Sequence, residues 1–169
     1  MSATVQIGES FISEGPEAAH VNTVLGDRSG PAGAAWAGAL AAPSAGHVPF
    51  VAVLRPSLPV KPLTLFVTKA AAVSTAHGEL TWGAAQAGIA GGVADAVADG
   101  VITREQADTW VLVAAVWVNP EAADADAVYA NNRRAVAEAL RNGAAGLPGV
   151  DAVLAERHAV RNPFYTPAG

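Results

Sequence analysis

His20 is the best single candidate in this 169-residue chain for moving a proton at neutral pH. It follows the acidic turn Ser13–Glu17 and begins a segment whose apolar and polar residues alternate as in a β-strand. An imidazole, with an ordinary pKa of about 6.5, can act as a general acid or base. Asn22 lies two residues further, on the same strand face, and could hydrogen-bond a ligand that His20 protonates. The alternatives are a structural or surface histidine and an asparagine that only supplies polarity.

Lys69 ends a predicted strand over residues 62–69, in phase with the apolar residues Leu63, Leu65 and Val67. A lysine in phase with an apolar face is unusual, because burying an unpaired ammonium group is costly. Its charged end could instead extend past the strand end into solvent. If it does not, the spacing predicts an amine that meets an anionic or carbonyl-bearing ligand.

Gln86 shares a helical stripe with Ile89, Val93 and Val97, at spacings of three, four and four residues. A glutamine in a buried stripe needs a hydrogen-bond partner. That partner is either backbone or the edge of a bound heterocycle.

Several classes of site are absent from the sequence. It has no cysteine, and its four histidines lack the spacing of metal ligands, so we expect no metal. It also lacks a phosphate-binding loop, a dinucleotide-binding glycine motif and the serine-hydrolase elbow. By elimination, acid–base chemistry on a bound small molecule remains.

Composition excludes several partners and locations. The chain is 51% hydrophobic, but 40 of its residues are alanine, and the larger apolar residues suffice for one packed core. With a net charge of −5, neither nucleic acid nor an anionic membrane is an attractive partner. No apolar run is long enough to span a membrane and no secretory signal begins the chain, so we expect a cytoplasmic protein.

The elements that must position these residues mix strands and helices. Strands are predicted over residues 3–12, 19–25, 48–55, 62–69 and 110–118. Helices are predicted from Pro31 to about residue 42, over 83–98, briefly after Thr103, over 120–142 and over 148–157. No repeat or long linker interrupts the pattern. The sequence therefore predicts a single domain over residues 1–169, an α+β two-layer sandwich.

A series of motifs resembles one family, the formaldehyde-activating enzymes, over nearly the whole chain and in matching order. The motifs are Val5-Gln-Ile-Gly-Glu9, Glu17-Ala-Ala-His-Val-Asn22, Gly26-Asp-Arg-Ser-Gly-Pro31, Arg55-Pro-Ser-Leu-Pro-Val-Lys-Pro-Leu-Thr-Leu65, Gly83-Ala-Ala-Gln-Ala-Gly88, Val97-Ala-Asp-Gly-Val-Ile102, Gln106-Ala-Asp-Thr-Trp-Val-Leu-Val113 and Glu121-Ala-Ala-Asp124. The resemblance implies condensation of formaldehyde with tetrahydromethanopterin, a fold similar to the second domain of ribosomal protein S5, and a homopentamer with pterin sites between subunits.

The resemblance also implies roles for individual residues. The proton-donating histidine of the family falls on His20. The pterin-contacting positions fall on Asn22, Val51, Lys69, Ala71 and Gln86. Three of these positions depart from the family, which usually has aspartate at 22, leucine at 51 and threonine at 71.

These departures keep three hypotheses in view. The first is a hydro-lyase acting on tetrahydromethanopterin or a related reduced pterin as co-substrate. The second is a relative that binds formaldehyde or a different reduced pterin without this activity, as a sensor or binding protein. The third is a purely structural oligomer. His20, Lys69 and Gln86 favour the first two over the third, and Asn22 and Ala71 keep the second open beside the first.

Overall fold

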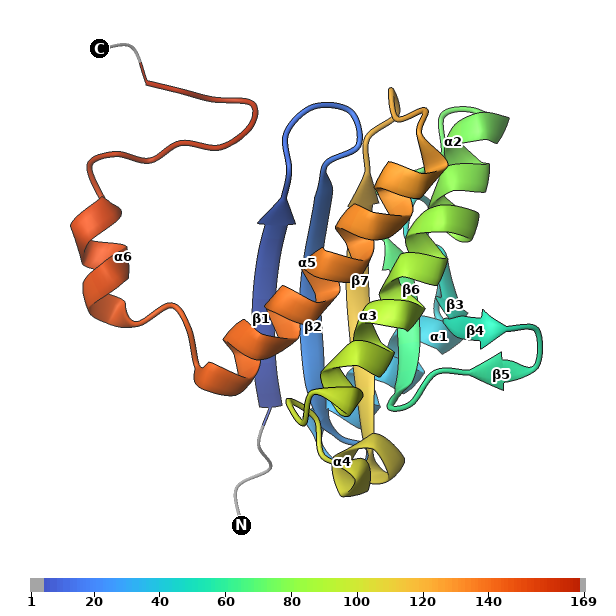
Figure 1. The fold of residues 1–169 in the computed structure, drawn as a ribbon. Helices are drawn as coiled ribbons and strands as arrows, with labels where there is room; N and C mark the ends of the chain where they lie inside the picture. Colours follow the sequence, from blue (N-terminus) through green and yellow to red (C-terminus); the bar gives the residue numbers. More distant parts are fainter. Residues whose placement is uncertain (1–4, 168–169) are drawn as a thin grey trace.

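The computed structural model describes residues 5–167, and within this range the chain forms a five-stranded mixed sheet in the order β1-β2-β7-β6-β3 (Figure 1). The strands of this sheet are β1 (Val5–Ile12), β2 (Ala19–Asp27), β3 (Pro49–Val51), β6 (Leu63–Thr68) and β7 (Trp110–Val118). β6 runs parallel to β7, and the other neighbours are antiparallel. The short strands β4 (Val53–Arg55) and β5 (Leu58–Pro59) pair separately.

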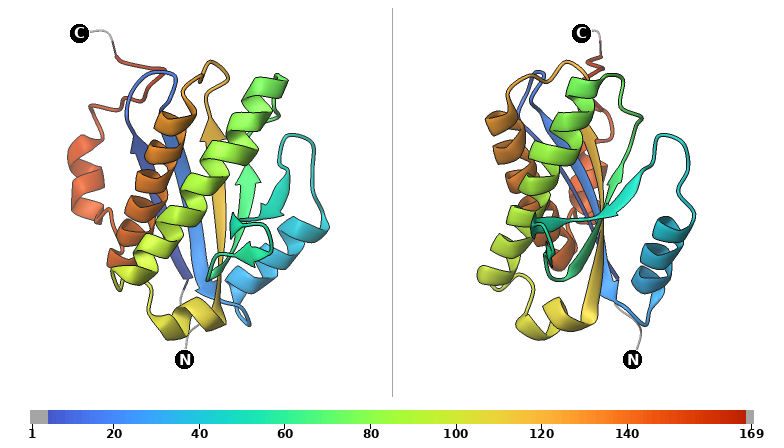
Figure 2. Two further views of the ribbon diagram at one scale, coloured as in Figure 1. Left: turned by 45° about the vertical axis from the view of Figure 1, so that its right-hand side comes forward. Right: turned by 90° about the vertical axis from the view of Figure 1, so that its right-hand side faces the viewer.

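Helices lie on both faces of the sheet. They are α1 (Pro31–Ala41), α2 (Thr75–Glu79), the π-helical turn η1 (Leu80–Ala85), α3 (Gln86–Ala98), α4 (Arg104–Thr109), α5 (Ala125–Ala145) and α6 (Val150–Glu156). α3 and α5 lie side by side on one face, and α1 lies on the opposite face, as Figure 2 shows. The fold class is the predicted α+β sandwich, with α1 as an addition on the second face.

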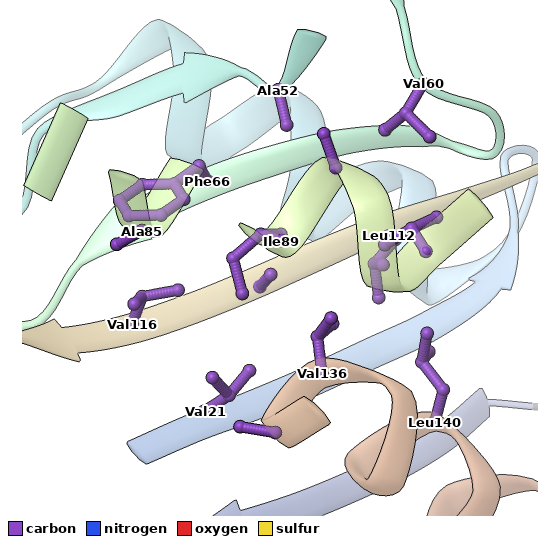
Figure 3. Packing of buried hydrophobic residues seen from close by; sticks show 14 of the residues in the cluster. Val21, Ala52, Val60, Phe66, Ala85, Ile89, Leu112, Val116, Val136 and Leu140 are labelled. Atoms are coloured by element: carbon purple, nitrogen blue, oxygen red, sulfur yellow. The ribbon is translucent and has the colours of Figure 1, made fainter. Parts of the chain in front are cut away.

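The core lies between the sheet and the α3–α5 pair (Figure 3). Val21, Phe66 and Leu112 from the strands meet Ile89 and Val136 from the two helices, and all are buried. Alternating strand residues and the helical stripe of α3 thus supply one apolar layer. None of the helices between residues 5 and 167 has the length and apolar character to cross a bilayer.

Glycines let α3 and α5 approach closely. A Cβ atom built on Gly92 would lie 2.3 Å from the carbonyl oxygen of Arg133, and one built on Gly88 would lie 2.5 Å from that of Tyr129. Both distances are far below van der Waals contact. Glycine is therefore required at these two positions for the observed helix packing.

Several element boundaries differ from the sequence prediction. The strand predicted over 48–55 divides at Ala52 into β3 and β4. The helix predicted from residue 83 begins at Thr75, because the Ser74 hydroxyl accepts a hydrogen bond from the backbone N–H of His77 and caps it. Residues 3 and 4 of the first predicted strand lie outside the described range.

The helix predicted over 120–142 is shifted toward the C-terminus. It begins after Asp124, whose carboxylate accepts hydrogen bonds from the N–H groups of Asp126 and Ala127. It ends at Ala145, before Gly146 in the left-handed region with φ of 65°, and so continues past the predicted end at residue 142 and through Gly143. A side-chain cap and a left-handed glycine are stronger boundary signals than Pro120 and a glycine with helical backbone.

Candidate functional site

One end of the second sheet face is left uncovered by α1. The indole N–H of Trp36 in α1 donates to the carbonyl oxygen of Leu63, 3.1 Å away, so this helix covers the end where β6 begins. The other end carries side chains from all five strands, which we call the site face. The site face consists of Glu9, Phe11, His20, Asn22, Val51, Val67, Lys69, Ala115 and Trp117.

Strand register brings four of the predicted site residues to this face. His20 pairs with Trp117 of β7, and Lys69 stands level with Trp117 on the other side, its N–H donating to Val116 at 2.9 Å. His20 and Lys69 therefore flank one central strand, with backbones about 10 Å apart, or two strand spacings. Asn22 shares the face of His20, and Val51 pairs with Leu65 in phase with Lys69.

Glu9 is the direct partner of His20. Its carboxylate oxygen Oε1 lies 3.0 Å from Nε2 of the imidazole. The two side chains come from neighbouring strands, where Glu9 pairs with Asn22 and Phe11 pairs with His20. The ring of Phe11 lies 5.4 Å from the imidazole, measured between centroids, and limits the space around it.

The protonation of His20 is set by opposing influences. Partial burial lowers the pKa of His20 below its ordinary value, and the positive charge of Lys69 lowers it further. The charge and hydrogen bond of Glu9 act in the opposite direction. The imidazolium form is therefore scarcer at neutral pH than in a solvated histidine, but it is also a stronger acid.

Lys69 is the second perturbed group on the site face. Its Nζ is covered from solvent and has no hydrogen-bond partner among residues 5–167. Burial lowers the pKa of Lys69 to about 8, and the charge of Glu9 opposes this shift only in part. Clusters of groups with shifted pKa values are typical of catalytic sites, because chemistry needs proton donors and nucleophiles near neutral pH.

A hollow adjoins this cluster. It has a volume of about 680 Å³ and lies between the β1–β2 turn, the end of β7 and the C-terminal segment. Phe11 and Trp117, the two residues that flank His20 across the strands, form part of its wall. Phe164 packs edge-on against Trp117, with centroids 5.9 Å apart, and so covers one side.

Two predicted site residues do not join the others in this chain. Ala71 follows the end of β6 in an exposed segment. Gln86 begins α3, on the far side of the sheet, and its amide is engaged by backbone. Its Oε1 accepts from the N–H of Val53 at 2.8 Å, and its Nε2 donates to the Val53 carbonyl at 3.3 Å. Of the two partners expected for Gln86, backbone or a bound heterocycle, the structure shows the backbone. A pterin contact by Gln86 stays a prediction.

Sequence reasoning missed Glu9 and Trp117. Glu9 lies in a motif already singled out, but its link to His20 depends on the hairpin register. A signal for it exists, because pairing Ile12 with Ala19 across the turn places Glu9 diagonally opposite His20. Trp117 lies in the strand predicted over 110–118, and only the strand order places it between His20 and Lys69.

The side chains present suit acid–base and amine chemistry. Between residues 5 and 167, no three carboxylate or imidazole groups converge as a metal site would require. The site face instead offers a carboxylate–imidazole pair and an amine of lowered pKa, and two of its aromatic residues, Phe11 and Trp117, also line the hollow.

Comparison with known proteins gives a consistent result. The family model described as formaldehyde-activating enzyme matches residues 7–165. The 5,6,7,8-tetrahydromethanopterin hydro-lyase of Methanosarcina barkeri is 40% identical over 158 residues, which cover 94% of this chain and 89% of that protein. The bifunctional enzyme Fae/Hps of Archaeoglobus fulgidus is 44% identical over 159 residues, but the chain spans only 40% of its length.

Proposed function

The chain belongs to the formaldehyde-activating enzyme family, and from this premise we propose that it condenses formaldehyde with tetrahydromethanopterin, or a related reduced pterin, to the methylene derivative and water. The observation that carries this proposal is the Glu9–His20 pair on the site face, beside Lys69 and the hollow. A proton donor and a buried amine share the site face, and the hollow meets this face at Phe11 and Trp117.

In the proposed reaction His20 is the general acid. Formaldehyde adds to one ring nitrogen of the pterin, giving a carbinolamine, and loss of its hydroxyl group as water needs a proton. The imidazolium of His20 donates that proton, and a second amine nitrogen of the pterin then closes on the iminium carbon. General acid catalysis contributes about 10²–10⁴-fold. Holding both nitrogens near the carbon atom contributes through proximity.

Assembly is part of the proposal. We propose a cytoplasmic homopentamer, with pterin sites between subunits in which Asn22, Val51, Lys69, Ala71 and Gln86 contact the pterin. The exposure of the site face supports this arrangement, because a neighbouring subunit can complete a site that one chain leaves open. Ala71 and Gln86, separated from His20 within one chain, would then contribute from other positions in the ring.

A second candidate function rests on two residues. Asn22 carries no charge and Ala71 has no hydroxyl group, so each offers a pterin fewer polar contacts than the aspartate and threonine that the family usually has. A relative that binds formaldehyde or another reduced pterin without this condensation would fit these departures. Calorimetric titration with tetrahydromethanopterin and tetrahydrofolate side by side distinguishes the two functions.

The proposed role of His20 is tested by His20→Ala. We expect the turnover number to fall by about 10²–10⁴-fold, with pterin binding changed much less. Because burial and Lys69 lower the pKa of His20, the His20-dependent rate should decline as the pH rises through that pKa, and the variant should lose this decline. Stopped-flow measurement above the spontaneous condensation rate provides the readout.

The matched control is His158→Ala, which removes an exposed histidine from the C-terminal segment and should leave the rate unchanged. Equal rates for the His20 variant and the unmodified protein would return His20 to a structural role and remove the proposed mechanism.

A further inference from the structure

Lys69 has an environment that a merely structural or solvent-facing lysine avoids. Its backbone is fixed at the end of β6 by the hydrogen bond to Val116, and its Nζ is covered without any hydrogen-bond partner in the described part of the chain. An unpaired buried ammonium group is costly, so the neutral amine is favoured. The charged groups that face it across the sheet are Glu9 and, when protonated, His20.

The chain contains an internal comparison. Of its two lysines, Lys61 is exposed and forms an ion pair with the carboxylate of Asp108. Lys69 has no such partner within hydrogen-bond distance among residues 5–167. With a pKa of about 8, about a quarter of Lys69 is neutral near pH 7.5. A lysine of ordinary pKa is neutral in only about one molecule in a thousand under the same conditions.

We propose that Lys69 is a nucleophile that captures a small aldehyde covalently and, if the proposed function holds, passes its carbon to the reduced pterin. A desolvated neutral amine is the group that forms Schiff bases with carbonyl compounds. Formaldehyde, which carries only hydrogen on its carbon, is the aldehyde that a covered amine can admit with least displacement of its neighbours.

The capture proceeds in two balanced steps. The Nζ lone pair forms a bond to the carbonyl carbon, the π electrons move to oxygen, and a proton passes from nitrogen to that oxygen, giving a carbinolamine. The C–O bond then breaks with the electron pair on oxygen, a proton from His20 completes the water molecule, and the nitrogen lone pair forms the C=N bond of an iminium ion. No oxidant or reductant is needed.

Transfer of the carbon follows by exchange of amines. A secondary ring nitrogen of the pterin attacks the iminium carbon, and its proton passes to Nζ. The carbon–Nζ bond breaks with its electrons on the lysine, which leaves as the neutral amine, while the pterin nitrogen forms the new iminium. This transfer would replace the first step of the proposed reaction, the direct addition of formaldehyde to the pterin. Direct addition, with Lys69 only as a charged contact, is the alternative that experiment must exclude.

The protonation states of Lys69 and His20 are linked by the electrostatic influence of Lys69 on the imidazole. A charged Lys69 lowers the pKa of His20, so a neutral Lys69 no longer opposes the imidazolium. The protonation state with neutral Lys69 and protonated His20 is the one that the two capture steps require: a nucleophilic amine and an acid for the leaving hydroxyl group. The electrostatic interaction between the two side chains thus links the neutral state of the Lys69 amine to the protonated state of the His20 imidazole.

Reductive trapping tests the capture of formaldehyde by Lys69 without any pterin. The full chain is incubated near pH 7.5 with about one equivalent of formaldehyde and cyanoborohydride, which reduces an iminium to N-methyllysine, and peptide mass spectrometry locates the methyl group. We expect Lys69 to be modified at least about tenfold faster than Lys61. Modification of Lys61 as fast as Lys69, or faster, would overturn the proposal.

Lys69→Arg and Lys61→Arg form the matched pair. Arginine keeps the positive charge but forms no Schiff base, so Lys69→Arg should abolish the fast labelling and slow condensation at least about tenfold, whereas Lys61→Arg should change neither. Circular dichroism confirms that each variant is folded. Full condensation activity in a folded Lys69→Arg variant would overturn the transfer step. Fast labelling of Lys69 in a protein that turns over no pterin would instead support capture and reject the proposed function.

Discussion

At the scale of single residues, the protonation of His20 depends on two opposing neighbours: Glu9 raises the pKa of the imidazole and Lys69 lowers it. Glu9 lies on the β1 side at 3.0 Å, and Lys69 acts from the β6 side. Asn22 pairs with Glu9 across the hairpin, so residue 22 is close to the same imidazole. A charge at either position changes how often His20 is protonated at neutral pH.

Two substitutions should move the pKa of His20 in opposite directions. Glu9→Gln removes the charge that stabilises the imidazolium, so the pKa should fall further. Asn22→Asp adds a carboxylate on the same face, so the pKa should rise and the imidazolium should become more abundant at neutral pH. NMR titration of the imidazole resonances measures both shifts, and His47, an exposed loop histidine, serves as the internal reference. Shifts of the same sign in both variants would contradict this account.

At the scale of elements, the position of β4 depends on one side chain. Gln86, at the start of α3, satisfies both the N–H and the carbonyl of Val53, and it is 7% exposed. Val53 pairs with Pro59 in the β4–β5 ribbon, and Gln86 of α3 holds the same residue from the helix side. This clamp explains why an amide is tolerated in the buried stripe of the helix.

Removing the clamp should cost stability. Gln86→Met keeps the length of the side chain but leaves two backbone groups of Val53 unpaired, which should lower the free energy of unfolding by about 1–3 kcal/mol. Urea denaturation measures this difference. Ala87→Met, at an exposed neighbouring position, is the control and should stay within about 0.5 kcal/mol. A Gln86→Met variant of full stability that binds pterin poorly would identify Gln86 as a ligand contact instead.

The contact between α3 and α5 gives a second prediction at this scale. A methyl group on Gly92 would meet the Arg133 carbonyl and lie 2.4 Å from Cγ1 of Val136. Gly92→Ala should therefore destabilise the protein by about 1–3 kcal/mol, because the two helices must separate. Gly83→Ala is the control, since nothing lies within 4 Å of its added methyl group, and it should stabilise the helix by up to about 1 kcal/mol. Thermal unfolding of the two variants should thus shift in opposite directions.

At the scale of the whole molecule, the C-terminal part is poorly covered by its own chain. α6 stands beside the β1 edge of the sheet, away from the α3–α5 layer, and none of its residues is buried (Figure 1). Its apolar residues Val150, Val153 and Leu154 are 73%, 55% and 51% exposed. Apolar side chains gathered on one helix face in this way are typical of a surface that another protein covers.

Light scattering should therefore find an oligomer, of about 85 kDa for five chains of 17.0 kDa each. The double substitution Val153→Glu with Leu154→Glu places charges on the apolar side of α6 and should lower the mass at micromolar concentration. Ala152→Glu adds a charge on the opposite side of the same helix and should leave the mass unchanged. A monomer in the unmodified protein would contradict the assembly and would remove the site between subunits.

The sequence by itself determined the type of most elements and the candidate residues. Alternating residues indicated β1, β2 and β6, the helical stripe indicated α3, and the Thr103 and Gln106 pair formed the expected capping box. The fold class was predicted correctly on these local periodicities. His20 and Lys69 were also identified from local patterns. His20 begins an alternating strand segment after an acidic turn, and Lys69 continues the apolar face of a predicted strand.

Only the tertiary structure decided which residues meet. The order β1-β2-β7-β6-β3 places the His20 and Lys69 strands on either side of β7, and the hairpin register brings Glu9 to the imidazole. Gln86 hydrogen-bonds to the backbone of Val53, which lies 33 residues away in the sequence. Such contacts join distant parts of the chain, and strand order and register are set by the packing of the whole sheet against its helices, which no local pattern records.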